Sequence, residues 1–198
     1  MKKNMQSVGR PREFDEADVL DKVMDVFWAQ GYEGTGMSDI MSATGLTKGS
    51  LYKAFTNKHT LYLKALERYE ERHVNAMVTT LEVGEDPRAQ IEMFLDAPIK
   101  DAEAAGPNRG CFLCNASADR ADFDEATRAR VKRGFHKLAA PLTKLAAALS
   151  PEGKPAQAEE SAQMLLAVYA GMRIMSRSGL DLNQLQATKR AALRAIGG

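Results

Sequence analysis

Apolar residues recur at intervals of three and four positions along most of this chain, which is the spacing of one helix face. No segment alternates apolar and polar residues over the length that a strand needs. Glycine and proline clusters interrupt the pattern, for example at 83–87 and 105–110. We therefore predict an all-α fold with helices over residues 15–30, 37–44, 48–55, 60–82, 87–104, 110–120, 122–149, 156–177 and 181–196.

The first three predicted helices are short, and each has a start signal. Asp15, Thr35 and Thr47 are good N-cap residues, because their side-chain oxygens can accept hydrogen bonds from N–H groups of the first turn. Gly31 ends the first helix, and Gly45 supplies the positive φ that a tight turn between the second and third helices needs. Three helices with such a turn predict a helix-turn-helix domain.

The third helix has two faces of opposite character. Leu51 and Phe55 fall on one apolar stripe. The other side carries small, hydroxyl-bearing and basic residues, namely Gly49, Ser50, Tyr52 and Lys53. Such a helix can anchor to a core and enter a DNA groove. We predict a DNA-binding domain over residues 1–58 and a larger helical domain with its own core over residues 59–198.

The chain from about residue 14 to residue 61 resembles the DNA-binding domain of the tetracycline-repressor (TetR) family. The resemblance rests on Gly31-Tyr32-Glu33-Gly34-Thr35, Asp39-Ile40, Gly45-Leu46-Thr47-Lys48-Gly49-Ser50-Leu51-Tyr52, Phe55, Asn57-Lys58 and Leu61. It implies a homodimeric, sequence-specific repressor that leaves a palindromic double-stranded DNA operator when a small-molecule effector binds. A nonspecific architectural DNA-binding protein is an alternative, and it would bind all sequences equally with a steep salt dependence.

Several kinds of DNA contact are expected around the third helix. Lysines can neutralise phosphates, hydroxyl groups can donate to phosphate oxygens as the family's matching positions do, and glycine allows close backbone approach. The candidates are Lys48, Lys53 and Lys58 for phosphates, Thr35, Thr47 and Tyr52 for hydroxyl contacts, Gly49 for close approach, Ser50 or Lys53 for base edges, and Arg10 and Arg12 for the minor groove. Alternatively, these are ordinary solvated side chains.

Net charge does not indicate nucleic-acid binding, because the chain carries a formal charge of only +1. Acidic residues lie mostly on the first predicted helix. The basic residues lie in the N-terminal arm and around the third helix, namely Lys2, Lys3, Arg10, Arg12, Lys48, Lys53 and Lys58. Local charge, and not net charge, therefore decides phosphate binding. No apolar run approaches the roughly 20 residues that span a bilayer, and the N-terminus has no signal-peptide core. We expect a cytoplasmic protein without a membrane partner.

The last two predicted helices are the candidates for self-association. Apolar residues cover more than one face of helix 156–177, namely Ala162, Leu165, Leu166, Tyr169, Met172 and Met175. Helix 181–196 adds Leu182, Leu185, Ala192, Leu193 and Ile196. The resemblance implies a homodimer with a four-helix contact across a two-fold axis. Alternatively, both faces are covered within one subunit.

The resemblance also implies an effector cavity in the larger domain, whose occupant would favour the state that does not bind DNA. The candidates are apolar and sulfur-containing residues, a kind of residue that more often belongs to an ordinary core: Met77, Met93, Phe94, Cys111, Phe112, Cys114, Phe123, Phe135, Met164, Tyr169 and Met172. Polar contacts could come from His73, His136 and Arg173. Nothing in the sequence names the effector.

Cys111 and Cys114 are the only cysteines and stand one helical turn apart. A metal site would need further ligands, and the three histidines show no matching spacing, so we expect no metal and no cofactor. A thioredoxin-like centre would need a βαβ unit, which is absent from the pattern. The pair could sense oxidants or electrophiles, because a helix N-terminus near Arg109 would lower a thiol pKa. Alternatively, both thiols pack as small hydrophobic residues.

The motifs of common enzyme classes are missing. The sequence has no Gly-x-Ser-x-Gly elbow, no His-Glu-x-x-His pair and no dinucleotide fingerprint. Residues 45–50 superficially evoke a phosphate loop, but their glycine spacing differs. We expect no enzyme, and the remaining catalytic alternative is a cysteine-dependent enzyme with Cys111 as its nucleophile.

Overall fold

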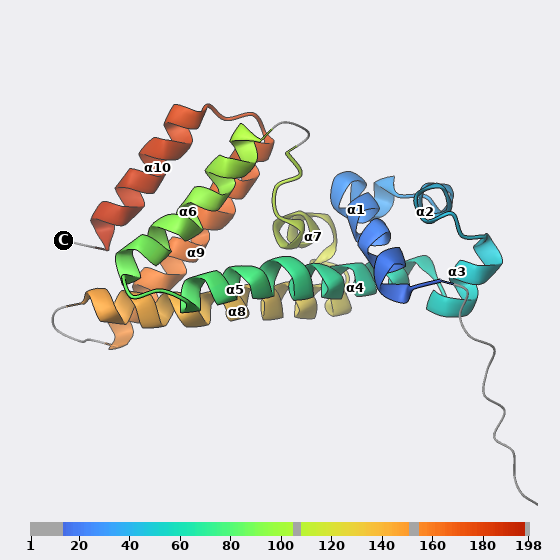
Figure 1. Cartoon of the computed structure of the whole chain (residues 1–198), viewed down its shortest axis with the longest axis horizontal. Coiled ribbons are helices and arrows are strands. Elements are labelled where there is room, and N and C mark those ends of the chain that lie inside the picture. Colours follow the sequence, from blue (N-terminus) through green and yellow to red (C-terminus); the bar gives the residue numbers. More distant parts are fainter. Residues whose placement is uncertain (1–13, 105–107, 151–154, 197–198) are drawn as a thin grey trace, which may run out of the picture.

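The computed structural model describes residues 14–104, 108–150 and 155–196, and all regular elements within these ranges are helical, as predicted. Figure 1 shows a group of short helices at one end of a longer helical body. The elements are α1 (Glu16–Gly34), α2 (Met37–Thr44), α3 (Lys48–Phe55), α4 (Lys58–Tyr69), the π-helical turn η1 (Glu70–Val74), α5 (Asn75–Glu82), α6 (Pro87–Glu103), α7 (Phe112–Arg120), α8 (Glu125–Leu149), α9 (Pro155–Arg177) and α10 (Leu182–Ala195). None of these helices is both long and apolar enough to cross a membrane.

Helix α1 is capped as predicted but continues past its predicted end. The Asp15 carboxylate accepts a hydrogen bond from the N–H of Ala17 at 2.8 Å. Gly31 interrupts the regular helix with a φ of 74°, and a further turn carries the chain to Gly34. Because glycine adopts positive φ without a steric cost, the chain can bend there and present this turn to the larger domain.

The N-cap of α2 is Gly36 rather than the predicted Thr35. The Asp39 carboxylate accepts a hydrogen bond from the N–H of Gly36 at 2.7 Å and closes the first turn. Thr35 instead ends α1, where its buried Oγ1 donates to the carbonyl oxygen of Gly31 at 2.7 Å. Gly45 has a φ of 73° and starts the turn into α3, as predicted.

The larger helical body is built on α8. Helix α9 packs along α8, α6 and α10 pack against α9, and the chain from α4 through α5 follows α8 (Figure 1). The predicted single helix over residues 60–82 is divided by η1. Within this wider turn Glu70 faces α8, where Arg133 and Lys137 lie 2.9 and 2.6 Å from its carboxylate oxygens. A π-helical turn often marks a functional site, and η1 lines a cavity described below.

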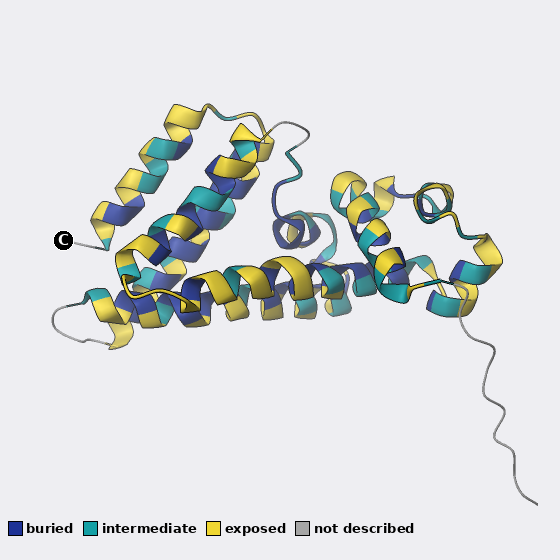
Figure 2. Ribbon diagram, viewed as in Figure 1, coloured by how far each residue is buried: buried dark blue, intermediate teal, exposed yellow. Residues whose placement is uncertain are grey.

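A continuous apolar core joins the short helices to the longer ones (Figure 2). Phe27 of α1 meets Tyr62 of α4 with ring centroids 5.1 Å apart, and Tyr62 in turn meets Phe112 of α7 at 5.9 Å. Helix α4 therefore packs against α1 on one side and against α7 and α8 on the other. The connection between the two groups of helices is this packed helix, with no intervening flexible linker.

Candidate functional site

Helix α3 is fixed to the protein by its apolar stripe. Leu51 and Phe55 are 1% and 2% exposed, respectively. At the start of the helix, Thr47 Oγ1 accepts a hydrogen bond from the N–H of Ser50 at 3.2 Å, so Thr47 is the N-cap that the sequence predicts. An isolated helix of eight residues is not stable in water. The burial of Leu51 and Phe55 and the Thr47 cap stabilise α3 on the rest of the protein.

The opposite face of α3 is open to solvent. Its exposed residues are Thr47, Lys48, Gly49, Tyr52 and Lys53. Tyr52 is 38% exposed although it is aromatic, and the Lys48 ammonium lies 5.8 Å from its ring centroid. A Cβ at Gly49 would meet only Thr47 Oγ1, at 4.0 Å, so a second molecule can approach the backbone here. The predicted division of α3 into a buried stripe and an exposed polar face is confirmed.

Other predicted DNA-contact residues are placed less openly. Thr35 is 1% exposed and its hydroxyl is engaged within α1, so it does not share the open face of α3. Ser50 is half-buried, and its Oγ lies 3.0 Å from Thr47 Oγ1. The Lys58 ammonium is 4.4 Å from the ring centroid of Tyr32. The predicted minor-groove residues Arg10 and Arg12 lie outside the described residues.

The end of α7 holds the end of α1 in an arrangement that the sequence analysis did not predict. Asp119 Oδ2 accepts a hydrogen bond from the N–H of Tyr32 at 2.8 Å. The guanidinium of Arg120 lies 3.8 Å from the Tyr32 ring centroid and 3.1 Å from a Glu33 carboxylate oxygen. We call Tyr32, Glu33, Asp119 and Arg120 the α1–α7 junction. No local sequence signal could have paired these residues, because they are more than eighty positions apart.

A second contact joins α4 to the start of α8. His59 Nε2 lies 2.7 Å from Asp124 Oδ2, and the Thr127 hydroxyl donates to the same oxygen at 2.6 Å. Burial opposes ionisation of Asp124, but the hydrogen bonds from Thr127 and His59 lower its pKa below the ordinary value. Asp124 is therefore a carboxylate at neutral pH, and it also caps α8 through the N–H of Ala126.

A cavity of about 360 Å³ lies between α1, α4, η1, α5, α6, α7, α8 and α9. Its volume is at the small end of the range of about 300–1,000 Å³ that is usual for small-molecule sites. Its walls are Trp28, Tyr69, Arg72, His73, Val74, Ala76, Met77, Thr80, Ala97, Asp101, Cys111, Leu113, Leu138, Tyr169 and Arg173. The predicted effector residues Met77, Cys111 and Tyr169 are among them, together with His73 and Arg173.

The remaining predicted effector residues lie elsewhere. Cys114 borders a different hollow, beside Gly31 and Asp119. Phe94, Phe112 and Met172 are core residues, Phe135 and Met164 are half-buried outside the cavity lining, and Met93, Phe123 and His136 are exposed on the surface. Phe94 still supports the cavity wall, because its ring stacks on Tyr169 with centroids 4.1 Å apart.

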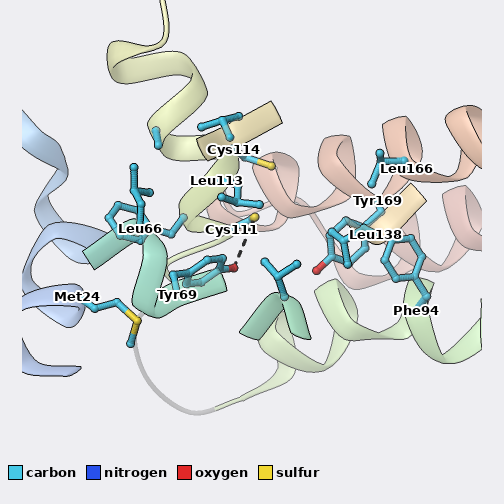
Figure 3. Close-up of a cluster of buried hydrophobic side chains, with 14 of the residues drawn as sticks. Met24, Leu66, Tyr69, Phe94, Cys111, Leu113, Cys114, Leu138, Leu166 and Tyr169 are labelled. Atoms are coloured by element: carbon cyan, nitrogen blue, oxygen red, sulfur yellow. Dashed lines mark hydrogen bonds between the residues drawn. The ribbon is translucent and has the colours of Figure 1, made fainter. Parts of the chain in front are cut away.

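The cysteine pair stands at the N-terminus of α7, with Cys111 as the N-cap residue. Both thiols are free and buried. The Tyr69 hydroxyl donates to Cys111 Sγ at 3.5 Å, as the dashed line in Figure 3 shows. The hydrogen bond with Cys114, that from Tyr69 and the cation of Arg173 lower the pKa of the Cys111 thiol against the effect of burial.

The cation beside Cys111 is Arg173 of α9, and not Arg109 as the sequence suggested. Arg109 turns away to Asp25, whose carboxylate lies 2.7 Å from its Nη1, and it covers the Trp28 ring at 4.2 Å. Arg173 donates through Nε to the Tyr169 hydroxyl at 2.9 Å and pairs with Asp101. In the described ranges, His, Cys, Asp and Glu side chains form no group of three that could hold a metal ion.

Comparison with known proteins agrees with this geometry. The profile of the family "Bacterial regulatory proteins, tetR family" matches residues 19–65. The chain is 30% identical over 203 residues to the HTH-type transcriptional repressor ComR of Escherichia coli (strain K12), and the match covers 96% of this chain and 92% of ComR.

Solved structures share the whole fold. The TetR family transcriptional regulator CifR, a cysteine mutant complexed with 26-bp double-strand operator DNA, matches with a TM-score of 0.81 and 26% identity over 94% of this chain and 99% of that chain. Reduced NemR of E. coli has the same fold, with a TM-score of 0.76 and 20% identity over 88% and 95% of the two chains. The chain belongs to the TetR family of bacterial DNA-binding transcriptional regulators.

Proposed function

We propose that this protein is a homodimeric repressor that binds a palindromic operator through α3 and leaves it when a small molecule occupies the cavity. The observation that carries the proposal is the exposed polar face of α3 over a buried Leu51 and Phe55. Lys48 and Lys53 supply positive charge, Thr47 and Tyr52 supply hydroxyl donors, and Gly49 leaves the backbone approachable. These are the groups that bind phosphates and reach base edges from a recognition helix.

The relatives support this reading. ComR is named a transcriptional repressor, and CifR is seen on double-strand operator DNA. The same surface of α3 would therefore contact phosphates and bases. Lys58, at the start of α4, would add one more phosphate contact through its ammonium group. Thr35 takes no direct part, because its hydroxyl already serves the carbonyl oxygen of Gly31.

Dimerisation through α9 and α10 is supported by an apolar stripe on the outer side of α9. The stripe consists of Met164, Ala167, Val168, Gly171, Ile174 and Met175, none of which is fully buried. Ile174 is 54% exposed, and a Cβ at Gly171 would meet nothing within 4 Å. Spacing of three and four residues places these positions on one face, and Leu182 of α10, 38% exposed, adds to the apolar surface. A two-fold contact would bury the stripe against its own copy.

Two α3 helices on one dimer also explain how a short helix can be specific. One recognition helix reads only a few base pairs, whereas two on a palindrome combine their discrimination. Effector binding would then act on the separation of the two α3 helices. The α1–α7 junction is one physical connection between the cavity and the DNA-binding helices, beside Trp28 of α1 and Tyr69 of α4, which line the cavity directly. The effector must bind the DNA-incompetent state more tightly for release to follow.

Selection of bound duplexes from random DNA with the full-length protein tests the proposal. We expect enrichment of one palindrome, bound by one dimer, with affinity lost when either half-site is scrambled. Equal recovery of all sequences, with affinity governed by salt alone, would contradict sequence-specific binding and indicate a nonspecific DNA-binding protein. Binding of a single half-site by a monomer would contradict the dimer.

A further inference from the structure

The strongest chemistry outside the DNA-binding face is the thiol of Cys111 in the cavity wall. We propose that Cys111 captures a small, neutral, α,β-unsaturated carbonyl compound in this cavity by conjugate addition, and that α7 conveys the capture to the DNA-binding helices. This inference rests on the proposed function, because it gives the chemical class of the effector and the residue that bonds to it.

The nucleophile is prepared by its surroundings. Cys111 is 3% exposed, and its sulfur accepts a hydrogen bond from the Tyr69 hydroxyl. As the N-cap of α7 it stands at the positive end of a helix, and the guanidinium of Arg173, which is paired with Asp101, also favours the thiolate. Donors and positive charge stabilise a thiolate, which is the reactive form of cysteine in addition to an electron-poor carbon.

The same cavity offers hydrogen-bond donors for a carbonyl oxygen. The Tyr69 hydroxyl lies beside Cys111, and the Tyr169 hydroxyl faces it from further along the cavity wall (Figure 3). Burial raises the pKa of Tyr69 well above its ordinary value and that of Tyr169 to about 12, so both hydroxyls keep their protons at neutral pH. The indole Nε1 of Trp28, which also lines the cavity, is buried without a hydrogen-bond partner among the described residues. A buried donor without a partner is costly, and a ligand oxygen would satisfy it.

The rest of the wall selects a small and uncharged compound. Val74, Met77, Ala97, Leu113 and Leu138 supply apolar surface around the thiol. Arg173, the buried cation, is already paired with Asp101, so it is not a free counter-ion for a charged ligand. A neutral carbonyl compound with a carbon–carbon double bond satisfies the donors and the apolar wall together.

The reaction balances within the cavity. The Cys111 sulfur forms a bond to the β-carbon, the carbon–carbon π bond breaks, and its electron pair moves to the carbonyl oxygen. The tyrosine hydroxyls stabilise the resulting enolate by hydrogen bonds. The proton that left the Cys111 thiol returns through solvent to the α-carbon, so the product is a saturated thioether and no oxidant or reductant is needed.

Helix α7 transmits the effect of the adduct because its first turn packs on α8 and its last turn contacts α1. Next to Cys111, Leu113 packs directly on Gly134 of α8, where a Cβ would come within 2.5 Å of Leu113 Cδ1. Helix α7 therefore has no room to move toward α8 when an adduct adds volume at Cys111. It must move away from α8, and its last turn holds Tyr32 and Glu33 of α1 through Asp119 and Arg120.

Methyl vinyl ketone is a suitable probe, with 2-butanone as the matched compound that lacks the double bond. We expect one adduct per chain on Cys111 by peptide mass spectrometry, and release of the protein from its selected operator. Cys111→Ser should lose the adduct. Cys114→Ala should still form it on Cys111, but more slowly than the wild type, because the thiolate loses the hydrogen bond with Cys114. Tyr69→Phe should also slow its formation, about tenfold, because the thiolate loses a donor. 2-Butanone should neither modify the protein nor release it.

Several results would overturn the inference. They are an adduct on Cys114 or on lysines with Cys111 untouched, equal release by 2-butanone, or formation of a Cys111–Cys114 disulfide by hydrogen peroxide while methyl vinyl ketone leaves Cys111 intact. Circular dichroism of Cys111→Ser and Cys111→Ala shows whether each variant is folded, and either folded variant suffices. The adduct is measured without DNA, so failure to bind any operator would contradict the proposed function separately.

Discussion

The main-chain N–H of Tyr32 donates a hydrogen bond to Asp119 Oδ2 at 2.8 Å, across 87 positions of the sequence. This bond joins the end of α1, in the DNA-binding helices, to the last turn of α7. Cys111, the N-cap residue of the same nine-residue helix, lies in the cavity wall. One short helix therefore contacts both the cavity and α1, which packs against the helix-turn-helix.

Asp119→Ala should weaken this connection. The Tyr32 N–H loses a charged acceptor, so we expect the free energy of unfolding to fall by about 1–3 kcal/mol. Urea denaturation of the full-length protein measures the change. Asp122→Ala, which removes a carboxylate from an exposed neighbouring position, should have little effect. An equal loss in the two variants would show that the α1–α7 junction has no special role in stability.

Leu51→Ala and Tyr52→Ala should have different effects on stability, because Leu51 packs in the core and Tyr52 lies on the exposed face of α3. Leu51 is 1% exposed, so its truncation should cost about 2–5 kcal/mol of stability. Tyr52 is exposed, and its removal should change the free energy of unfolding by less than about 0.5 kcal/mol. Thermal or urea unfolding of both variants checks the contrast. Similar destabilisation by both would mean that Tyr52 packs against the protein.

Asp124→Asn should make the free energy of unfolding less dependent on pH in the acid range. Hydrogen bonds from Thr127 and His59 hold the pKa of Asp124 below its ordinary value of 3.8 despite burial. Because the folded pKa is the lower one, the carboxylate's contribution is complete above the unfolded pKa and disappears as the pH falls through the folded pKa. Urea unfolding at pH values from about 5 downward should show a smaller decline for the variant. An identical decline in wild type and variant would contradict this role.

Ile174→Asp should disrupt the proposed dimer. The substitution places a charge in the apolar stripe of α9, where a two-fold contact would bury it next to its own copy. Analytical ultracentrifugation should show monomers for the variant and dimers for the wild type. Val83→Asp is the control, because Val83 is 69% exposed and lies outside the stripe. If the Ile174→Asp variant remains a dimer, the interface lies on another surface.

Lys48→Ala and Lys53→Ala should each reduce the salt dependence of operator binding. Every phosphate contact releases condensed counterions, so the slope of log affinity against log salt should become shallower by about one unit per lysine. Lys144→Ala removes a lysine that is 77% exposed on α8, far along the chain from α3, and should leave the slope unchanged. Unchanged slopes for all variants would remove these lysines from the DNA contact.

Local sequence patterns were sufficient to predict the buried stripe and the exposed polar face of α3. The spacing of Leu51 and Phe55, the cap at Thr47 and the glycine at Gly45 each act within one or two turns, and the structure confirms all of them. The N-cap of α2, which we predicted one residue too early, also depends on a local interaction. The Asp39 carboxylate accepts a hydrogen bond from the N–H of Gly36. Thr35 and Gly36 are both acceptable caps, so this choice could not be made from residue type alone.

The cavity depended on contacts that no local pattern specifies. Arg109 is two positions from Cys111, yet the cation beside that thiol is Arg173, which arrives on α9. The π-helical turn at Glu70–Val74, which sets the phase of His73 and Val74 against the cavity, has no reliable sequence signal. Helix crossing geometry decides which side chains meet, and that geometry is a property of the packed fold.

The central claim is that the exposed face of α3 reads the operator, and the most direct test is the operator affinity of Tyr52→Ala. Fluorescence anisotropy with the selected palindrome should give a dissociation constant at least about tenfold weaker than that of the wild type, equivalent to about 1.4 kcal/mol, with an unchanged unfolding curve. Wild-type affinity in folded Tyr52→Ala protein, together with wild-type affinity in Lys48→Ala, would contradict the account.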